Sequence, residues 1–204
     1  MPDKIDLRKT YKEIYAAGSV PAFVSVPELA IFSVSGEGDP RGSKRFADCV
    51  EALYAASYAL KMASKKSGGP DWGVLGLEGD WWCDDMAEFR MERRDIWKWE
   101  LLIVQPPFAT ESRAGEAIDE ARRKKGSQAA ADLRFGRQGA HEAAQVLHAG
   151  PYDAEPPTIA ALHDFIHAAG RVLAGRHREL YLSDARKTAP ERLRTIIRQP
   201  VLRP

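Results

Sequence analysis

The chain has 204 residues, of which 44% are hydrophobic and 29% are charged. Its 30 Lys and Arg residues are balanced by 29 Asp and Glu residues, which argues against a nucleic-acid-binding protein, because such proteins carry a clustered basic surplus. No apolar run approaches the ~20 residues of a membrane span, and the charged start lacks the apolar region of a secretory signal. With 2 cysteines, too few for a disulfide framework, the composition predicts a cytoplasmic globular protein without membrane partners.

The first half of the chain is expected to begin with a polar N-terminal extension, residues 1–27, that holds one short helix near Leu7–Tyr15. A strand should follow over 28–34, because the run ELAIFSV has strand composition and leads into a Gly-rich turn. Ser43 can then cap a long helix that stops at the Gly-Gly-Pro of residues 68–70. The apolar positions that recur at helical spacing in it are Phe46, Val50, Leu53 and Leu60.

Two strands are predicted next, over 72–83 and 97–105, and the charged residues 84–96 between them should form an exposed connection. Residues 110–125 favour a surface helix that joins two halves of the chain, because their propensity is helical and their apolar side is weak.

The second half repeats the first. Residues 142–149 favour a strand, and a helix can begin at Pro156-Pro157, since proline is tolerated in the first turn. Residues 177–183 and 193–201 favour two further strands. The helical stripe between these strands consists of Ile159, Leu162, Ile166, Ala169 and Leu173.

This internal repetition predicts the fold. We expect an α+β domain of two pseudo-symmetric strand–helix–strand–strand repeats, with about six strands in a mainly antiparallel sheet. Both long helices should cover one face of the sheet and leave a ligand cleft on the other. Within a single domain, 28–204, repeat one is expected to span 28–107 and repeat two 140–204, with a connecting helical segment over 108–139.

Side chains that alternate with core positions should point into this cleft, because successive residues of a strand face opposite sides. Those expected to do so are Trp97 and Trp99, Glu179 and Tyr181, and Glu78, Asp80 and Trp82. Acids and aromatic rings without a matching row of Lys or Arg favour a planar, apolar and in part cationic ligand.

Two interpretations of these residues stay open. Glu179, within the apolar strand ELYL, is either a buried acid that binds a cation or activates water, or an exposed acid on the wet face of the sheet. Glu78 holds the corresponding place in the first repeat, which favours the functional interpretation of both acids. The clustered tryptophans are Trp81, Trp82, Trp97 and Trp99. They either pack in the core or form an aromatic wall beside the acids, and their alternate spacing favours the wall.

No metal or cofactor site is predicted. His163 and His167 lie one helical turn apart, as in zinc-protease helices, but Asp164 replaces the expected Glu and a third ligand is missing from the pattern. His148 precedes a Gly-Pro-Tyr turn, where a histidine bonded to the backbone is commoner than a catalyst, and it is kept as a ligand-contact candidate.

Three segments carry a family resemblance: Glu78–Trp82 (EGDWW), Leu147–Tyr152 (LHAGPY), and Glu179–Asp184 (ELYLSD) with the block 186–200 that follows it. Together they resemble the GyrI-like small-molecule-binding family, and in particular its stand-alone branch, which also shows the Lys98-Trp99 pair. The resemblance runs over nearly the whole chain, whereas the Gly-Pro-Tyr turn alone is shared by a wider superfamily.

The resemblance implies two pseudo-symmetric repeats and a cleft for hydrophobic, often cationic, aromatic compounds around a central Glu, which Glu179 matches. Some stand-alone members hydrolyse the cyclopropane of DNA-alkylating natural products of the yatakemycin and duocarmycin type, without a cofactor. The residues that would match are Glu179 and Glu78 as acids, Tyr152 as hydrogen-bond donor, Trp82, Trp99 and Tyr181 as walls, and Trp81, Trp97 and His148 as further ligand contacts. The DNA-binding domain of the family's regulators has no counterpart here, so no direct contact with nucleic acid is expected.

Three functions therefore compete. The first is a detoxifying hydrolase of cyclopropanoid compounds, and the second is a non-catalytic protein that sequesters aromatic molecules. The third, a haem carrier, ranks last because His148 and His177 are weak candidates for an axial ligand. The oligomeric state stays open.

Overall fold

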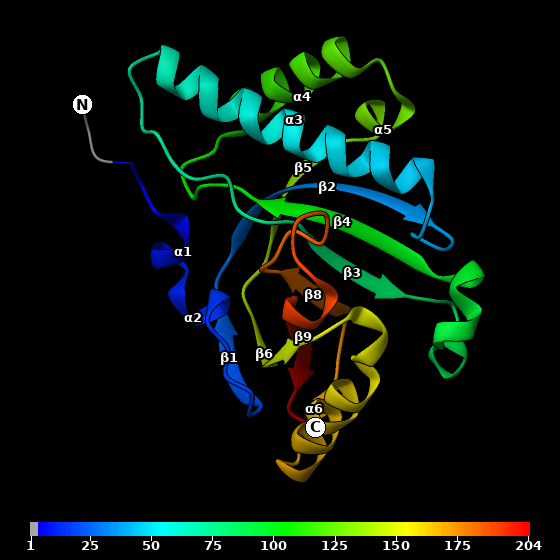
Figure 1. Cartoon of the computed structure of the whole chain (residues 1–204). Helices are drawn as coiled ribbons and strands as arrows, with labels where there is room; N and C mark the ends of the chain where they lie inside the picture. Colours follow the sequence, from blue (N-terminus) through cyan, green and yellow to red (C-terminus); the bar gives the residue numbers. More distant parts are fainter. Residues whose placement is uncertain (1–3) are drawn as a thin grey trace.

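The computed structural model describes residues 4–204 and shows the expected pair of repeats (Figure 1). The first repeat consists of β2 (Leu29–Glu37), α3 (Lys44–Lys66), β3 (Glu78–Trp82) and β4 (Lys98–Val104). The second consists of β6 (His141–Ala149), α6 (Pro156–Ala168), β8 (His177–Tyr181) and β9 (Arg194–Leu202). The α+β fold class with two strand–helix–strand–strand repeats is thus confirmed.

The sheet is antiparallel and symmetric about its middle. The strand order is β1-β6-β9-β8-β3-β4-β2-β5, so β8 and β3 pair at the centre and each outer strand has a counterpart in the other half. The sequence prediction lacks β1 (Ala22–Val26), β5 (Arg134–Gln138) and the short β7 (Val172–Leu173), which make the sheet 9-stranded within residues 4–204. Apolar periodicity could not predict β5, because its sequence, RFGRQ, has only one large apolar side chain.

The sheet curls because its two ends are joined. β1 runs into β2 and β5 runs into β6, and these two long segments pair with each other. The pairs Val26↔His141 and Leu29↔Gln138 keep one register across the junction, so the ladder passes from β1–β6 to β2–β5 without a slip. One face of the sheet therefore turns inward and the other outward.

The helices begin and end where local chemistry allows. The Ser43 side chain accepts a hydrogen bond from Phe46 N and caps α3, as expected. Thr110 caps α4 (Glu111–Lys125), which ends at Gly126 in the left-handed conformation with φ of 59°. α4 and the short α5 (Gln128–Ala131) pack on α3, so the link between the repeats thickens the layer over the first half of the sheet (Figure 1). Four short 3-10 helices, η1 (Met86–Glu88), η2 (Met91–Ile96), η3 (Tyr152–Ala154) and η4 (Pro190–Arg192), lie in connections within residues 4–204.

Two sequence expectations are corrected by these bounds. The strand expected over 72–83 is only Glu78–Trp82, because Trp72 instead bridges to Ile5 and is 2% exposed in the core. The helix expected near Leu7–Tyr15 is present as two turns, α1 (Leu7–Thr10) and α2 (Lys12–Tyr15).

The N-terminal segment fills the inward face of the sheet. Leu7, Tyr11 and Ile14 are buried there. Arg198 of β9 donates to the carbonyl of Ile14, and the Gln145 side chain donates to the carbonyls of Glu13 and Ala16. The described part of the segment expected as an extension therefore belongs to the core, and residues 1–3 lie outside the described range.

A polar contact under this segment gives a testable consequence. The Tyr15 hydroxyl donates to Glu78, which is 1% exposed. Burial raises the pKa of Glu78, and the charges of Arg178 and Arg198, followed by the hydrogen bond from Tyr15, oppose that rise. Tyr15→Phe should lower the free energy of unfolding by about 1–3 kcal/mol near pH 8, because it leaves a buried carboxylate without its donor. The raised pKa means that the folded state binds this proton more tightly than the unfolded state, so the loss should shrink toward about pH 5.

Urea unfolding at both pH values measures this, with Tyr58→Phe on the exposed side of α3 as the matched control. An equal loss in the two variants, or a loss that grows in acid, would contradict the assignment.

Candidate functional site

Strand pairing decides which side chains share a face of the sheet. Gly79 of β3 lies opposite Glu179 of β8, and Trp81 lies opposite both His177 and Trp99. These residues project on the face that carries the helices, because Phe46 of α3 contacts Trp81 and Trp99 with ring centroids 6.2 and 5.2 Å away. The expectation that Glu179 faces a cleft on the side opposite the two long helices is therefore corrected: it lies between the N-terminal ends of α3 and α6.

Glu179 is the centre of a hydrogen-bonded cluster. Its Oε2 accepts from the Tyr181 hydroxyl at 2.8 Å, and its Oε1 lies 3.3 Å from Nε2 of His177. The indole Nε1 of Trp81 donates to the Tyr181 hydroxyl at 3.1 Å, which orients that hydroxyl toward the carboxylate. The Glu179 side chain is 14% exposed, so this carboxylate is held in place yet can still meet a ligand or a water molecule.

A second carboxyl, absent from the sequence prediction, lies against the first. Glu155, at the start of α6, is 4% exposed. Burial and then the neighbouring Glu179 carboxylate raise the pKa of Glu155 well above its ordinary value, which favours the protonated form of Glu155. The only hint of it in the sequence is its position three residues after the Gly-Pro-Tyr turn.

Tyrosines complete the cluster with protonated hydroxyl groups. The ring of Tyr152 meets that of Tyr181 edge-on with centroids 5.7 Å apart. Burial, followed by the charge of Glu179, raises the pKa of Tyr152 to about 12 and places that of Tyr181 well above its ordinary value. Both hydroxyls can therefore act as hydrogen-bond donors at any physiological pH.

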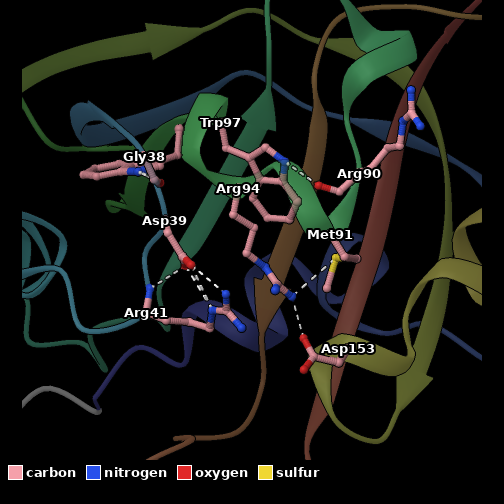
Figure 2. A network of polar contacts seen from close by, with 9 residues as sticks. Gly38, Asp39, Arg41, Arg90, Met91, Arg94, Trp97 and Asp153 are labelled. Carbon is pink, nitrogen blue, oxygen red and sulfur yellow. Dashed lines mark hydrogen bonds and ion pairs between the residues drawn. The ribbon is translucent and has the colours of Figure 1, made fainter.

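An aromatic wall continues from Trp81 beneath the segment that links β3 to β4. Trp97 meets Trp81 edge-on at 5.8 Å and stacks on Phe89 at 4.6 Å. Arg94 lies over the Trp97 ring, 5.5 Å from its centroid, and reaches the second repeat through a 2.5 Å ion pair with Asp153, next to Tyr152 (Figure 2). The segment expected as an exposed connection thus packs partly on the wall and bridges the two repeats.

The structure brings most of the predicted site residues together. Glu179, Tyr181, Tyr152 and Trp81 form the cluster, and Trp97 backs it. His148 is near the Gly-Pro-Tyr turn as expected, but its Nδ1 lies 2.9 Å from Thr158 Oγ1 and its Nε2 lies 3.3 Å from the Pro151 carbonyl. Both ring nitrogens are therefore engaged in holding the turn against α6.

Three predicted or neighbouring residues face the other way. Glu78, Asp80 and Trp82 project on the face opposite α3 and α6, because β3 pairs Glu78 with Leu180 and Asp80 with Arg178. Glu78 meets Tyr15 there, as described above. Trp82 stacks under the Arg176 guanidinium at 3.5 Å. The expected pairing of Glu78 with Glu179 in one cleft, and of Trp82 with the ligand wall, is thus corrected by the register of two neighbouring strands.

The face opposite α3 and α6 does hold a cleft, but of a different kind. Its volume is about 380 Å³, and Asp80, Glu100, Arg176 and Arg178 line it. These charges are paired: Asp80 meets Arg178 at 2.6 Å, and Glu100 meets Arg176 at 3.0 Å. Such a lining suits neither a planar apolar ring nor a free carboxylate.

Trp99 shares the cluster's face but is a core residue. It is fully buried, and its indole lies directly over Gly36 of β2. Its Nε1 donates to the Gly38 carbonyl at 3.3 Å. The core interpretation therefore holds for Trp99. Trp81 and Trp97 are buried in the same core cluster, at 4% and 8% exposed, and Trp81 in addition borders the acids.

Within residues 4–204, no helix is long and apolar enough to cross a membrane. The same range contains no group of three or more His, Cys, Asp or Glu side chains placed to hold a metal ion.

Two repeats around an acidic aromatic cluster define a small-molecule-binding α+β domain. The GyrI-like small molecule binding domain matches residues 20–202, so the chain belongs to the GyrI-like family and the resemblance seen in the sequence is confirmed. Among curated proteins no match is found.

Solved structures agree with this assignment. An uncharacterized conserved protein from Listeria innocua is 35% identical with a TM-score of 0.89, over 98% of this chain and 100% of that one. A hydrolase from Listeria innocua is 35% identical with a TM-score of 0.87, over the same shares of 98% and 100%. The EcmrR C-terminal domain, 17% identical with a TM-score of 0.56 over 90% of this chain and 98% of that one, shares the fold alone.

The placement of Trp99 predicts the effect of a single methyl group. A Cβ at Gly36 would lie 2.1 Å from the Trp99 ring, so Gly36→Ala should displace the indole and lower the free energy of unfolding by about 1–3 kcal/mol. Gly136→Ala on β5 is the control, because its Cβ would meet nothing within 4 Å. Urea unfolding followed by tryptophan fluorescence compares the two variants, and equal stability would refute the core assignment of Trp99.

Proposed function

We propose that the protein binds planar aromatic molecules against the wall of Trp81 and Trp97 and hydrolyses cyclopropanoid, DNA-alkylating compounds among them. The observation that carries the proposal is Glu179, a partly exposed carboxylate held by Tyr181 and His177 beside that wall. Such a group can orient and deprotonate water without a metal or an organic cofactor.

The reaction needs little activation by the protein, because a spirocyclopropane conjugated to a dienone is already electrophilic. Water attacks the ring methylene, and the bond between that carbon and the dienone ring breaks. The bonding electron pair passes to the dienone oxygen, which becomes a phenolate. Glu179 takes the proton that the water loses, and the wall fixes the planar substrate for attack.

Charge that develops on the oxygen needs a hydrogen-bond donor. Tyr152 fits this role, because its pKa of about 12 keeps the hydroxyl protonated and its ring stands beside Tyr181 at the edge of the cluster. The hydrolase name of the 35% identical Listeria innocua protein supports an enzymatic function. That name gives no substrate, so the cyclopropanoid substrate of this chain is our proposal.

A non-catalytic binding protein is the second candidate. The same wall and carboxylate would hold an aromatic cation without any reaction, through ring stacking and charge attraction. Haem carriage has less support, because both ring nitrogens of His148 are hydrogen-bonded and Nε2 of His177 faces Glu179. Turnover separates the first two functions.

Glu179→Gln tests the proposal directly. With a yatakemycin- or duocarmycin-type compound, the wild-type protein should add one water, a gain of ~18 Da, over many turnovers, and the variant should lose about 10²–10⁴-fold in rate. A neutral planar ligand should still bind the variant and quench the fluorescence of Trp81 and Trp97. Mass spectrometry of the compound and fluorescence titration supply the two readouts.

Glu51→Gln, an exposed acid on α3, is the matched control and should leave both readouts unchanged. Intact compound with quenched fluorescence would replace the hydrolase by the binding protein. Intact compound without quenching would exclude this ligand class.

A further inference from the structure

We propose that Glu155 and Glu179 form a carboxyl pair that holds one proton between them, in which Glu155 is the positioning residue that orients Glu179. The kinetic consequence of the pair rests on the proposed hydrolysis, but the shared proton itself does not. The inference stands on the backbone at the start of α6, on the burial of Glu155 and on the groups that surround it.

The backbone explains why the Glu155 carboxyl is free to leave its own helix. Glu155 occupies the N-cap position of α6, where an acidic side chain ordinarily accepts a hydrogen bond from the second or third helical N–H. It makes no such bond. Pro156 and Pro157 follow it and have no backbone N–H, so a capping Glu155 side chain would find few unpaired N–H donors at the helix start.

Packing then directs the carboxyl toward the sheet. Glu155 is 4% exposed, and the Glu179 carboxylate is its neighbour on β8. One of its oxygens, Oε1, is buried and has no hydrogen-bond partner within residues 4–204. An unpaired acid buried to this degree is rare, because desolvation strongly disfavours its charged form.

Within residues 4–204, no Lys, Arg or His side chain forms an ion pair with Glu155. Glu179 and Tyr181 face it from β8, and Tyr152 and Asp153 face it from η3. Thr195 of β9 faces it as well, and Nε2 of His177 lies 3.3 Å from Oε1 of Glu179. Two ionised carboxylates side by side would repel each other, and a single proton between them removes the repulsion. The raised pKa of Glu155 agrees with this reasoning.

In the proposed reaction the pair acts as a base of fixed orientation. The proton on Glu155 is donated to one oxygen of Glu179, which leaves the carboxylate charge directed toward the attacking water. When Glu179 takes the water proton, both carboxyls are protonated, and one proton then leaves to the product phenolate or to solvent. The active form therefore carries one proton on the pair, which predicts a bell-shaped dependence of kcat/KM on pH.

Infrared spectroscopy tests the shared proton without any substrate. The difference spectrum of the wild-type protein minus Glu155→Gln, recorded near pH 8, should show the carbonyl band of a protonated carboxyl group, since the pair retains its proton there. The subtraction cancels the contribution of Glu78, a second buried acid with a raised pKa, because Glu78 is present in both proteins. Glu191→Gln, an exposed acid of η4, should give no such band in the same subtraction. A wild-type spectrum that loses only a carboxylate band would overturn the proposal.

Glu179→Gln supplies a second measurement should Glu155→Gln fold poorly. Removing the neighbouring charge should move the titration of the Glu155 carbonyl band to lower pH, and an unmoved titration would also overturn the pair. In turnover, Glu155→Gln should retain a rate within about tenfold of wild type near neutrality but lose the alkaline fall of kcat/KM, whereas Glu155→Ala should lose about 10–100-fold at every pH. A merely structural role would leave the alkaline limb in both variants.

The two proposals fail separately. If the protein shows the protonated carboxyl band but hydrolyses no cyclopropanoid compound, the carboxyl pair is supported and the hydrolase proposal is refuted. If the protein hydrolyses the compound but lacks the band, the hydrolase proposal is supported and the carboxyl pair is refuted.

Discussion

The antiparallel pairing of β3 with β8 is the constraint on which the rest of this structure depends. It joins the two repeats at the middle of the sheet and sets Gly79 opposite Glu179 and Trp81 opposite His177. Because side chains alternate between faces, this single register assigns every neighbouring residue to a side. The absence of a side chain at Gly79 also matters, since a Cβ there would lie 2.9 Å from Trp81 Nε1 and 3.3 Å from the Tyr181 hydroxyl.

The two faces that result carry different chemistry. On the outward face, the ends of α3 and α6 enclose Glu155 and Glu179 among tyrosine hydroxyl groups and the His177 imidazole. On the inward face, Asp80 and Arg178 form a close ion pair, and the N-terminal segment seals Glu78 from water. Buried opposite charges stabilise one arrangement of the sheet, whereas two buried acids side by side are costly unless they share a proton or serve a function.

This division explains how a fold with internal symmetry holds an asymmetric site. The first repeat contributes the aromatic wall, and the second contributes both carboxyls and the tyrosines. The Arg94–Asp153 ion pair connects them at the rim, where exposure of Asp153 makes the contact weak and compatible with ligand entry. Membership of the GyrI-like family and the 35% identical hydrolase from Listeria innocua fit a ligand site of this construction.

The sequence by itself determined the repeats, the helix starts at Ser43, Thr110 and Pro156, and Glu179 as a candidate site residue, because these follow from periodicity, capping chemistry and composition along one segment. Tertiary structure alone decided that Glu78 turns away from Glu179, that Trp99 is core and that Glu155 joins the cluster. Period-two alternation orders side chains within a strand, but it does not say how the next strand is aligned, and a slip of one residue exchanges the faces. Glu155 carries no periodic signal at all, since its direction comes from a helix start that packs on a strand distant in the chain.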